Sequence, residues 1–148
     1  MVEIRKAHRS ELGEVLNLVQ QLAIFERAPQ EVTVTVEEYE RDFEDNLFDV
    51  FVAIKDQKIV GIAFFYIGYS TWKGKMLYLE DLFVLPEYRK QGIGKMLFDA
   101  VIAEANEQQC RLVKWQVLDW NTEAQKFYSK YQAVIEREWW NGRIVLKS

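Results

Sequence analysis

A six-residue segment, Arg89-Lys90-Gln91-Gly92-Ile93-Gly94, carries the strongest chemical signal in this chain of 148 residues. It lies between an apolar stretch that predicts a strand and a helical pattern of apolar residues. Its two glycines would let the backbone approach a ligand closely, and the N-terminus of the following helix offers unpaired N–H groups. Arg89 and Lys90 add positive charge at the same point. Together these features suit a pyrophosphate group.

The spacing of this segment excludes two familiar nucleotide-binding motifs. A P-loop needs Ser or Thr directly after its Gly-Lys pair, whereas Met96 follows Lys95. The dinucleotide motif needs a third glycine where Leu97 stands. A plain glycine turn that leads into a helix and binds nothing remains the alternative interpretation.

One carboxylate interrupts the apolar pattern just before this segment. Glu80 stands among Leu79, Leu82 and Phe83, in the middle of a predicted strand. A carboxylate in apolar surroundings loses hydration, so it needs a partner or a function. It either pairs with a neighbouring Lys or Arg or acts on a ligand, and the second interpretation is favoured.

Several kinds of chemistry are excluded by composition. The chain has one histidine (His8) and one cysteine (Cys110), too few for a His/Cys zinc site, so no metal is expected. The same shortage argues against a Ser-His-Asp or Cys-His nucleophile. A single cysteine permits no internal disulfide framework and fits a reducing compartment.

The chain also lacks the signals of membrane and nucleic-acid proteins. Its longest apolar run, 59–69, is about half the ~20 residues needed to span a bilayer. The charged, alternating N-terminus predicts a strand rather than a signal peptide. The isoelectric point near 5.2 argues against general nucleic-acid binding. We therefore expect a cytoplasmic protein with neither a membrane nor a nucleic acid as its partner.

Charge is unevenly distributed along the chain. Residues 26–49 hold nine acidic residues against Arg27 and Arg41, while the whole chain carries a formal charge of −4. An acidic arm on a mildly basic body would suit a cationic substrate and an anionic cofactor. A solvated helix face is the plainer alternative.

The elements that must position these residues follow from hydrophobic periodicity. Helices are predicted over 12–23, from a Thr35 cap with Glu38 completing a capping box, over 93–105 and over 122–131. Strands are predicted over 2–5, 48–54, 59–69, 76–84, 113–117, 133–139 and 143–147. No repeat or linker interrupts the chain, so residues 1–148 are expected to form a single domain. Three consecutive antiparallel candidates followed by a strand-helix-strand unit predict a mixed sheet with helices packed on it.

The R-x-x-G-x-G pattern resembles the coenzyme A-binding signature of the GNAT N-acetyltransferases. Further strings resemble the diamine (spermidine/spermine) acetyltransferase subfamily, and most of all its thialysine-acetylating branch. These strings are Tyr69–Gly74 (YSTWKG), Tyr78–Asp81 (YLED), Pro86–Arg89 (PEYR) and Val117–Asn121 (VLDWN). The resemblance implies an α/β (α+β) GNAT fold, with a mixed, mostly antiparallel sheet of six to seven strands flanked by about four helices.

The resemblance also implies two catalytic residues. GNAT enzymes move acetyl from acetyl-coenzyme A directly to an amine. Glu80 matches the carboxylate beside the attacking nitrogen, where it would anchor the ammonium ion, accept its proton, or both. Tyr128 matches the tyrosine that faces the coenzyme sulfur and would protonate or hydrogen-bond the departing thiolate; its neighbour Phe127 is expected to be the core residue of that helix.

The remaining implied site residues divide between coenzyme and substrate. The coenzyme would be held by Leu82, Phe83, Val84, Arg89, Lys90, Gln91, Gly92, Ile93, Gly94, Lys95, Asn121, Thr122, Glu123, Ala124 and Tyr128. The amine would be held by Phe25, Glu26, Trp72, Glu80 and Asp81. The resemblance further implies a homodimer with its substrate sites near the interface.

Four positions depart from the subfamily pattern. Ser70 stands where polyamine-preferring members carry an acid, and Trp140 occupies a position that is acidic in relatives. Gln132 and Lys90 each replace a glycine. The leading hypothesis is an acetyltransferase for a small cationic amine such as thialysine, a lysine-like amino acid or a short diamine or polyamine. The alternatives are a protein lysine or N-terminal acetyltransferase and a coenzyme A-binding sensor without turnover.

Overall fold

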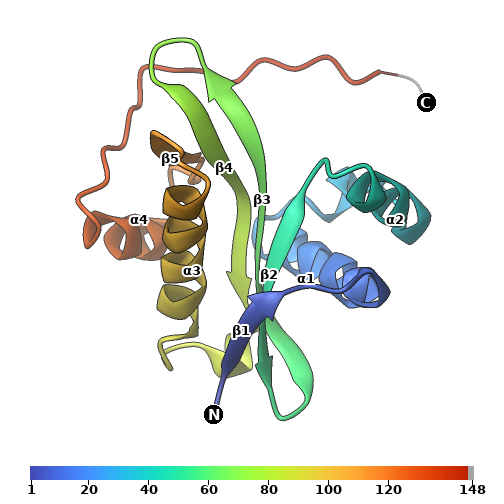
Figure 1. The fold of residues 1–148 in the computed structure, drawn as a ribbon. Helices are drawn as coiled ribbons and strands as arrows, with labels where there is room; N and C mark the ends of the chain where they lie inside the picture. Colours follow the sequence, from blue (N-terminus) through green and yellow to red (C-terminus); the bar gives the residue numbers. More distant parts are fainter. Residues whose placement is uncertain (147–148) are drawn as a thin grey trace. The chain divides into compact units, whose positions relative to one another are not determined.

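A computed structural model describes residues 1–146 and contains five strands, four α-helices and three short 3-10 helices (Figure 1). Its contacts divide the chain into two compact units, Met1–Gln116 and a second unit that begins at Val117. The strands are β1 (Glu3–Lys6), β2 (Asp49–Lys55), β3 (Lys58–Ser70), β4 (Gly74–Val84) and β5 (Leu112–Trp115). The helices are η1 (Arg9–Glu11), α1 (Leu12–Phe25), η2 (Pro29–Glu31), α2 (Val36–Glu44), η3 (Pro86–Tyr88), α3 (Ile93–Glu107) and α4 (Thr122–Ser129).

All five strands belong to the first unit and form one sheet in the order β1-β2-β3-β4-β5. The first three junctions are antiparallel, whereas β5 lies parallel to β4 after the crossover through α3. The predicted mixed, mostly antiparallel sheet with helices on it is therefore confirmed.

The strand count is lower than the predicted six to seven. Residues 133–146 contain no strand, so the strand predicted over 133–139 is wrong. The strand predicted over 143–147 is also absent as far as residue 146, and Lys147 lies outside the described residues. Alternation of apolar and polar residues marks a chain that suits a sheet face, but a strand also needs a neighbour for its backbone hydrogen bonds.

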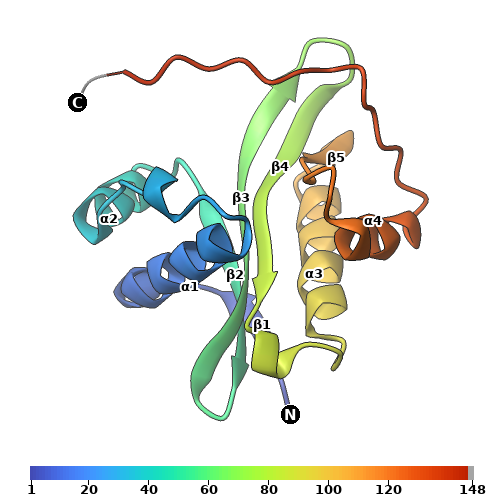
Figure 2. The same ribbon diagram turned by 180° about the vertical axis from the view of Figure 1, so that it is seen from behind.

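Helices cover both faces of the sheet in the first unit. Helices α1 and α2 lie on one face and α3 lies on the other, as the two opposite views show (Figures 1 and 2). On the second face, a Cβ at Gly61 would lie 3.0 Å from Leu97 of α3 and 3.2 Å from the Phe83 carbonyl oxygen, so the glycine lets the helix pack closely on this strand. The fully buried side chains that fill the two layers are mostly aliphatic, with Phe65 and Phe98 the largest. Among residues 1–146, no helix has the length and apolarity to cross a bilayer.

Polar contacts fix the starts of the two helices on the first face. At α2, the predicted capping box is confirmed: Glu38 N donates to Thr35 Oγ1 at 3.1 Å, and Thr35 N donates to the Glu38 carboxylate. Before α1, Arg5 forms two hydrogen bonds with the Glu11 carboxylate, which lowers the pKa of Glu11 to about 2. His8 N also donates to that carboxylate at 2.8 Å.

The second unit is built around α4. Asn121 Oδ1 accepts a hydrogen bond from Ala124 N at 3.1 Å and so caps the helix. Gln125 Nε2 donates to the carbonyl oxygens of Leu118 and Asp119, which ties the preceding turn to the helix. After the helix, Gln132 adopts a left-handed φ of +59°, the conformation for which the subfamily uses a glycine.

Candidate active site

The middle of β4 contains an irregularity at Glu80. Phe65 of β3 lies opposite Leu79, but the preceding residue Phe64 lies opposite Asp81. Glu80 is therefore an extra residue with no partner across the ladder, which is the definition of a β-bulge. Bulges re-aim side chains, and this one places two successive carboxylates, Glu80 and Asp81, at the irregularity.

The bulge opens onto the face covered by α1 and α2. Tyr39 of α2 contacts the ring of Phe64 at 5.6 Å, so Phe64 and its cross-strand partner Asp81 share that face. Two residues along the ladder, Tyr66 and Tyr78 stack with their ring centroids 5.2 Å apart. Three tyrosines thus surround the carboxylates of β4.

Burial and mutual repulsion disturb the titration of these groups. Burial, followed by the charges of Glu80 and Glu26, raises the pKa of Asp81 to about 7. Burial also raises the pKa values of Glu26 and Glu80, although Glu80 as a whole residue is exposed. Burial, together with Asp81 and Glu80, raises the pKa of Tyr39 to about 12.

These three carboxylates, Glu26, Glu80 and Asp81, are called the acidic cluster below. None of them forms an ion pair with a Lys or Arg among residues 1–146. The interpretation that Glu80 pairs with a neighbouring cation is therefore wrong. Buried negative charge without a protein cation lowers stability, so the cluster is suited to a cation from outside the chain.

The predicted substrate residues lie in two places. Phe25 ends α1 and Glu26 caps it. The charge of Glu26 acts on Asp81, which brings this helix end to the acidic cluster, and the Phe25 ring is partly exposed. Trp72 lies in the β3–β4 turn. Six residues of β4, Gly74 to Leu79, lie between this turn and Glu80, which corresponds to roughly 20 Å at about 3.3 Å per residue. Its side chain is 82% exposed, and its contact with the substrate stays a prediction.

Residues 89–95, called the coenzyme turn below, connect β4 and η3 to α3. Gly92 is the N-cap of α3 with φ of +80°, and it has no side chain to satisfy the free N–H groups of the first helical turn. A Cβ at Gly92 would meet nothing within 4 Å, so the backbone here is open to a ligand. Lys90 also adopts a left-handed φ, +63°, where the family pattern has a glycine. The open backbone and its positive charge fit a pyrophosphate.

Arg89 is held by three contacts at one end of the coenzyme turn. Its guanidinium lies 5.1 Å from the ring centroid of Phe25 and 5.4 Å from that of Phe83. Its Nε donates to the Val84 carbonyl oxygen at 3.0 Å. Arg89 therefore connects the end of α1, on the substrate side, to the end of β4.

The end of β4 has one open edge. Strand β5 pairs with β4 only from Met76 to Leu79 within the described residues, so Leu82 and Phe83 have β3 on one side alone. An open strand edge presents backbone N–H and C=O groups to an extended ligand arm. This edge leads directly from Glu80 to the coenzyme turn.

Tyr128 is buried in the structure, with 7% of its surface exposed, whereas Phe127 is only partly buried. The expectation that Phe127 is the core residue of α4 is therefore wrong. At 5.3 Å the two rings contact edge to face. The predicted coenzyme residues Asn121, Thr122 and Ala124 form the capped start of the same helix.

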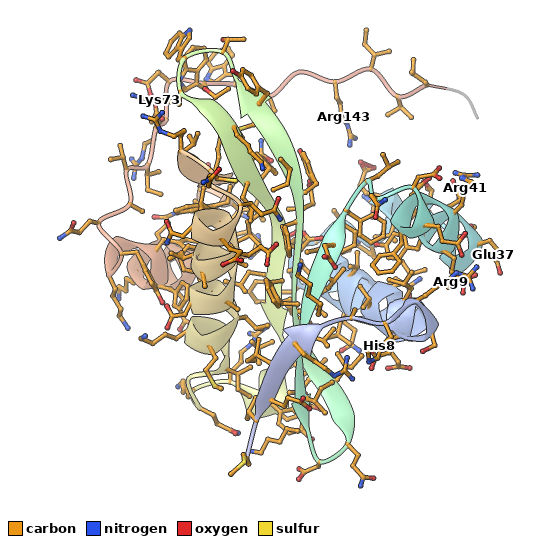
Figure 3. The ribbon with its side chains drawn as sticks, viewed as in Figure 1. His8, Arg9, Glu37, Arg41, Lys73 and Arg143 are labelled. Atoms are coloured by element: carbon orange, nitrogen blue, oxygen red, sulfur yellow. The ribbon has the colours of Figure 1, made fainter. Side chains whose placement is uncertain are left out.

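The acidic residues of the stretch 26–49 differ in what they contact. Most of its carboxylates are engaged locally: Arg9 binds Glu40 and Glu44 beside α2 (Figure 3), and Lys6 lies 3.4 Å from Asp49. These contacts favour the plainer interpretation of a solvated helix face for α2. Glu26 alone of the stretch joins the acidic cluster.

The sequence interpretation did not include the tyrosines around the acidic cluster. Tyr66 and Tyr78 occupy alternate positions of their strands with Phe64 and Glu80, a period that places them on one face. Two adjacent acids within an apolar strand were a signal for the bulge, since they break that period. Tyr39 could not be found this way, because its contact depends on how α2 packs.

Comparisons with known proteins show the family of this chain. The model of the acetyltransferase (GNAT) family matches residues 14–133, most of the chain. The chain belongs to the GNAT acetyltransferase family. It is an acetyltransferase, and acetyl-coenzyme A is the acetyl donor that this family uses.

Named relatives act on small amines. The chain is 34% identical to the thialysine N-epsilon-acetyltransferase of Bos taurus, over 95% of this chain and 89% of the relative. It is 34% identical to the L-ornithine N5-acetyltransferase of Arabidopsis thaliana, over 58% of this chain and 38% of the relative. An aminoglycoside acetyltransferase from a soil metagenomic sample has the same fold, with a TM-score of 0.82, 24% identity and coverage of 99% and 97%.

Proposed function

We propose that this enzyme acetylates the primary amine of a small cationic substrate: thialysine, a lysine-like amino acid, a diamine or a polyamine. One observation carries the proposal: Glu26, Glu80 and Asp81 gather at the β4 bulge without a cation of the described chain beside them. A substrate with two ammonium groups would supply the missing positive charge. The similarity to thialysine and ornithine acetyltransferases supports the same class of substrate.

The proposed reaction starts with deprotonation of the amine. A primary amine has a pKa near 10.4, so presenting it in its neutral form at pH 7 takes roughly 4–5 kcal/mol. Glu80 pairs with the ammonium ion and accepts its proton, which frees the nitrogen lone pair to attack the acetyl carbonyl carbon. The raised pKa of Glu80, a consequence of burial, makes it a stronger base than an ordinary carboxylate.

The reaction ends when the thioester bond breaks and sulfur departs as a thiolate. Tyr128 is proposed to donate its phenolic proton to that sulfur. Its burial, with 7% of its surface exposed, supports the role because a packed side chain holds its hydroxyl in a fixed position. Glu26 and Asp81 bind the second ammonium group, and Phe25 and Trp72 line the path of the amine.

The coenzyme is proposed to lie along the open edge of β4. Leu82, Phe83 and Val84 would pair with the pantetheine arm, although the Val84 carbonyl already accepts from Arg89. The coenzyme turn, Arg89 to Lys95, would bind the pyrophosphate through backbone N–H groups, with the capped start of α4 as the further contact.

A free-thiol release assay tests the proposal. Acetyl-coenzyme A is supplied with thialysine, lysine, ornithine, putrescine, spermidine or a lysine-bearing peptide. We expect saturable turnover with at least one free amine and almost none with the peptide. Turnover of the peptide alone would identify a protein acetyltransferase instead. Coenzyme binding without any turnover would support the sensor.

Three further properties are also proposed. The family match over residues 14–133 extends across both compact units and supports a single domain over 1–148. The subfamily resemblance supports a homodimer. The single cysteine, Cys110, supports a reducing, cytoplasmic location.

A further inference from the structure

The hairpin between β2 and β3 places two lysines directly opposite each other. Asp56 and Gln57 form its two-residue turn with φ of +53° and +62°, the left-handed pair that the tightest hairpin turns require. Lys55 and Lys58 flank this turn and are partners across the ladder. Like charges in this position repel and destabilise the pair, so the arrangement is costly for the hairpin alone.

No carboxylate among residues 1–146 forms an ion pair that would relieve this repulsion. Neither Lys55 nor Lys58 forms a salt bridge with any residue that the structure describes. Instead, both ammonium groups face one aromatic ring: Lys55 Nζ lies 5.9 Å and Lys58 Nζ 5.7 Å from the ring centroid of Tyr88. A shared ring keeps the two charges together rather than apart.

The ring and a hydrogen bond tie these lysines to the coenzyme turn. Tyr88 ends η3, immediately before the turn. Lys55 Nζ donates to Gln91 Oε1, a side chain of the turn itself. Lys90, exposed and without an ion pair among residues 1–146, adds a third ammonium group. Three lysines without an ion pair among residues 1–146 therefore adjoin the open N-terminus of α3: Lys90 from the turn itself, and Lys55 and Lys58 from a hairpin whose Lys55 is 36 residues from Gln91 in the sequence.

We propose that Lys55 and Lys58 form a second anion subsite, which binds a phosphate monoester beyond the pyrophosphate. In coenzyme A that group is the 3′-phosphate of the ribose. A monoester carries close to two negative charges at pH 7, so it matches two ammonium groups better than a single pyrophosphate oxygen does. The proposal rests on the proposed coenzyme role of residues 89–95, and it gives the hairpin a function in discriminating coenzyme A from its dephospho form.

Titration calorimetry on the full chain tests this subsite with coenzyme A and dephospho-coenzyme A as probes. The test variant is Lys55→Ala with Lys58→Ala. Lys55→Arg with Lys58→Arg keeps both charges, and Lys73→Ala removes an exposed lysine of the β3–β4 turn, far along β3 from the hairpin (Figure 3). We expect the alanine pair to weaken coenzyme A about tenfold and to leave dephospho-coenzyme A within about twofold. The arginine pair and Lys73→Ala should bind as the wild type does.

Two further readouts sharpen the result. The difference in coenzyme A affinity between the wild type and the alanine pair should become smaller as the salt concentration is raised, because the lost contact is electrostatic. The alanine pair loses the Lys55–Gln91 hydrogen bond and the contacts with Tyr88 as well as the mutual repulsion, so its melting temperature should stay within about 4 °C of the wild type. A larger drop would show a structural role and contradict the premise.

The other outcomes overturn the proposal in different ways. Equal weakening of both probes would assign the lysines to the pyrophosphate, and no weakening of either would exclude a ligand at the hairpin. If wild-type protein bound neither probe, the coenzyme role of residues 89–95 would fail as well. That last result is the only one that also contradicts the proposed function.

Discussion

The middle and the end of β4 present opposite chemistry within a few residues of one strand. The bulge at Glu80 gathers carboxylates whose pKa values are raised, so it is prepared for a cation. The strand then runs into the coenzyme turn, where Arg89 and Lys90 precede an uncapped helix N-terminus that favours an anion. Each region lacks the charge that its ligand would bring.

Under the proposed function, this difference would let one strand order two substrates. The bulge would present side chains, because the chemistry proposed there is proton transfer and charge recognition. The turn exposes backbone, because N–H groups bind phosphate oxygens closely only when no side chain intervenes. The Arg89 guanidinium contacts the rings of both Phe25 and Phe83 and so connects the two regions.

The largest effect is expected from removing the carboxylate of Glu80. Glu80→Gln keeps the size of the side chain but removes the base, so kcat should fall about 10²–10⁴-fold. The pH–rate profile should lose its low-pH limb at the same time. Glu87→Gln, in the exposed η3, is the matched control and should change neither. If KM rose while the limb persisted, Glu80 would only anchor the ammonium ion.

The next effect is expected from a substitution that fills the open backbone of the coenzyme turn. Gly92→Val places a β-branched residue at φ of +80°, which should lower the free energy of unfolding by about 1–3 kcal/mol and raise the KM for acetyl-coenzyme A. Urea unfolding and steady-state kinetics measure both. Gly13→Ala, in α1 with free space around it, should instead stabilise by about 0.5–1 kcal/mol. An unchanged KM in Gly92→Val would remove the turn from the coenzyme site.

A smaller, pH-dependent effect is expected at Asp81. Its folded pKa of about 7 lies above its ordinary value of 3.8, so the stability it contributes is complete below about pH 4 and lost as pH rises through 7. Asp81→Asn cannot ionise. It should therefore be more stable than the wild type at pH 8, by at most about 4 kcal/mol, and the difference should vanish near pH 4.

Chemical denaturation at both pH values measures the Asp81 effect. Asp45→Asn, at the exposed end of α2, is the control and should shift stability equally at both. A stability gain at Asp81→Asn that did not depend on pH would mean that the carboxyl is not protonated in the folded protein.

Much of this fold was predictable because local patterns agree with tertiary packing. The α3 helix and the Thr35–Glu38 capping box follow from periodicity and short-range chemistry, and the structure contains both. The strand predicted over 133–139 failed, because alternation alone cannot supply a neighbouring strand.

The site was predictable in part. The glycines of the coenzyme turn and Glu80 stand out in the sequence. Two glycines directly before a helical pattern and a carboxylate within an apolar strand are both unusual in those surroundings. The contacts of Lys55 with Gln91 and of Tyr39 with Phe64 join residues far apart in the chain, so they depend on packing. Lys90 and Gln132, which replace glycines, both keep the left-handed conformation, which the residue types alone would not indicate.

The central claim is that β4 binds the amine at its bulge and the coenzyme at its end. It is tested most directly by measuring the KM values for the amine and for acetyl-coenzyme A in Asp81→Asn and Gly92→Val. Asp81→Asn should raise the KM of the amine and leave that of acetyl-coenzyme A within about twofold. Gly92→Val should do the reverse. If each variant shifted both constants equally, the bulge and the turn would not be separate sites, and the account would be contradicted.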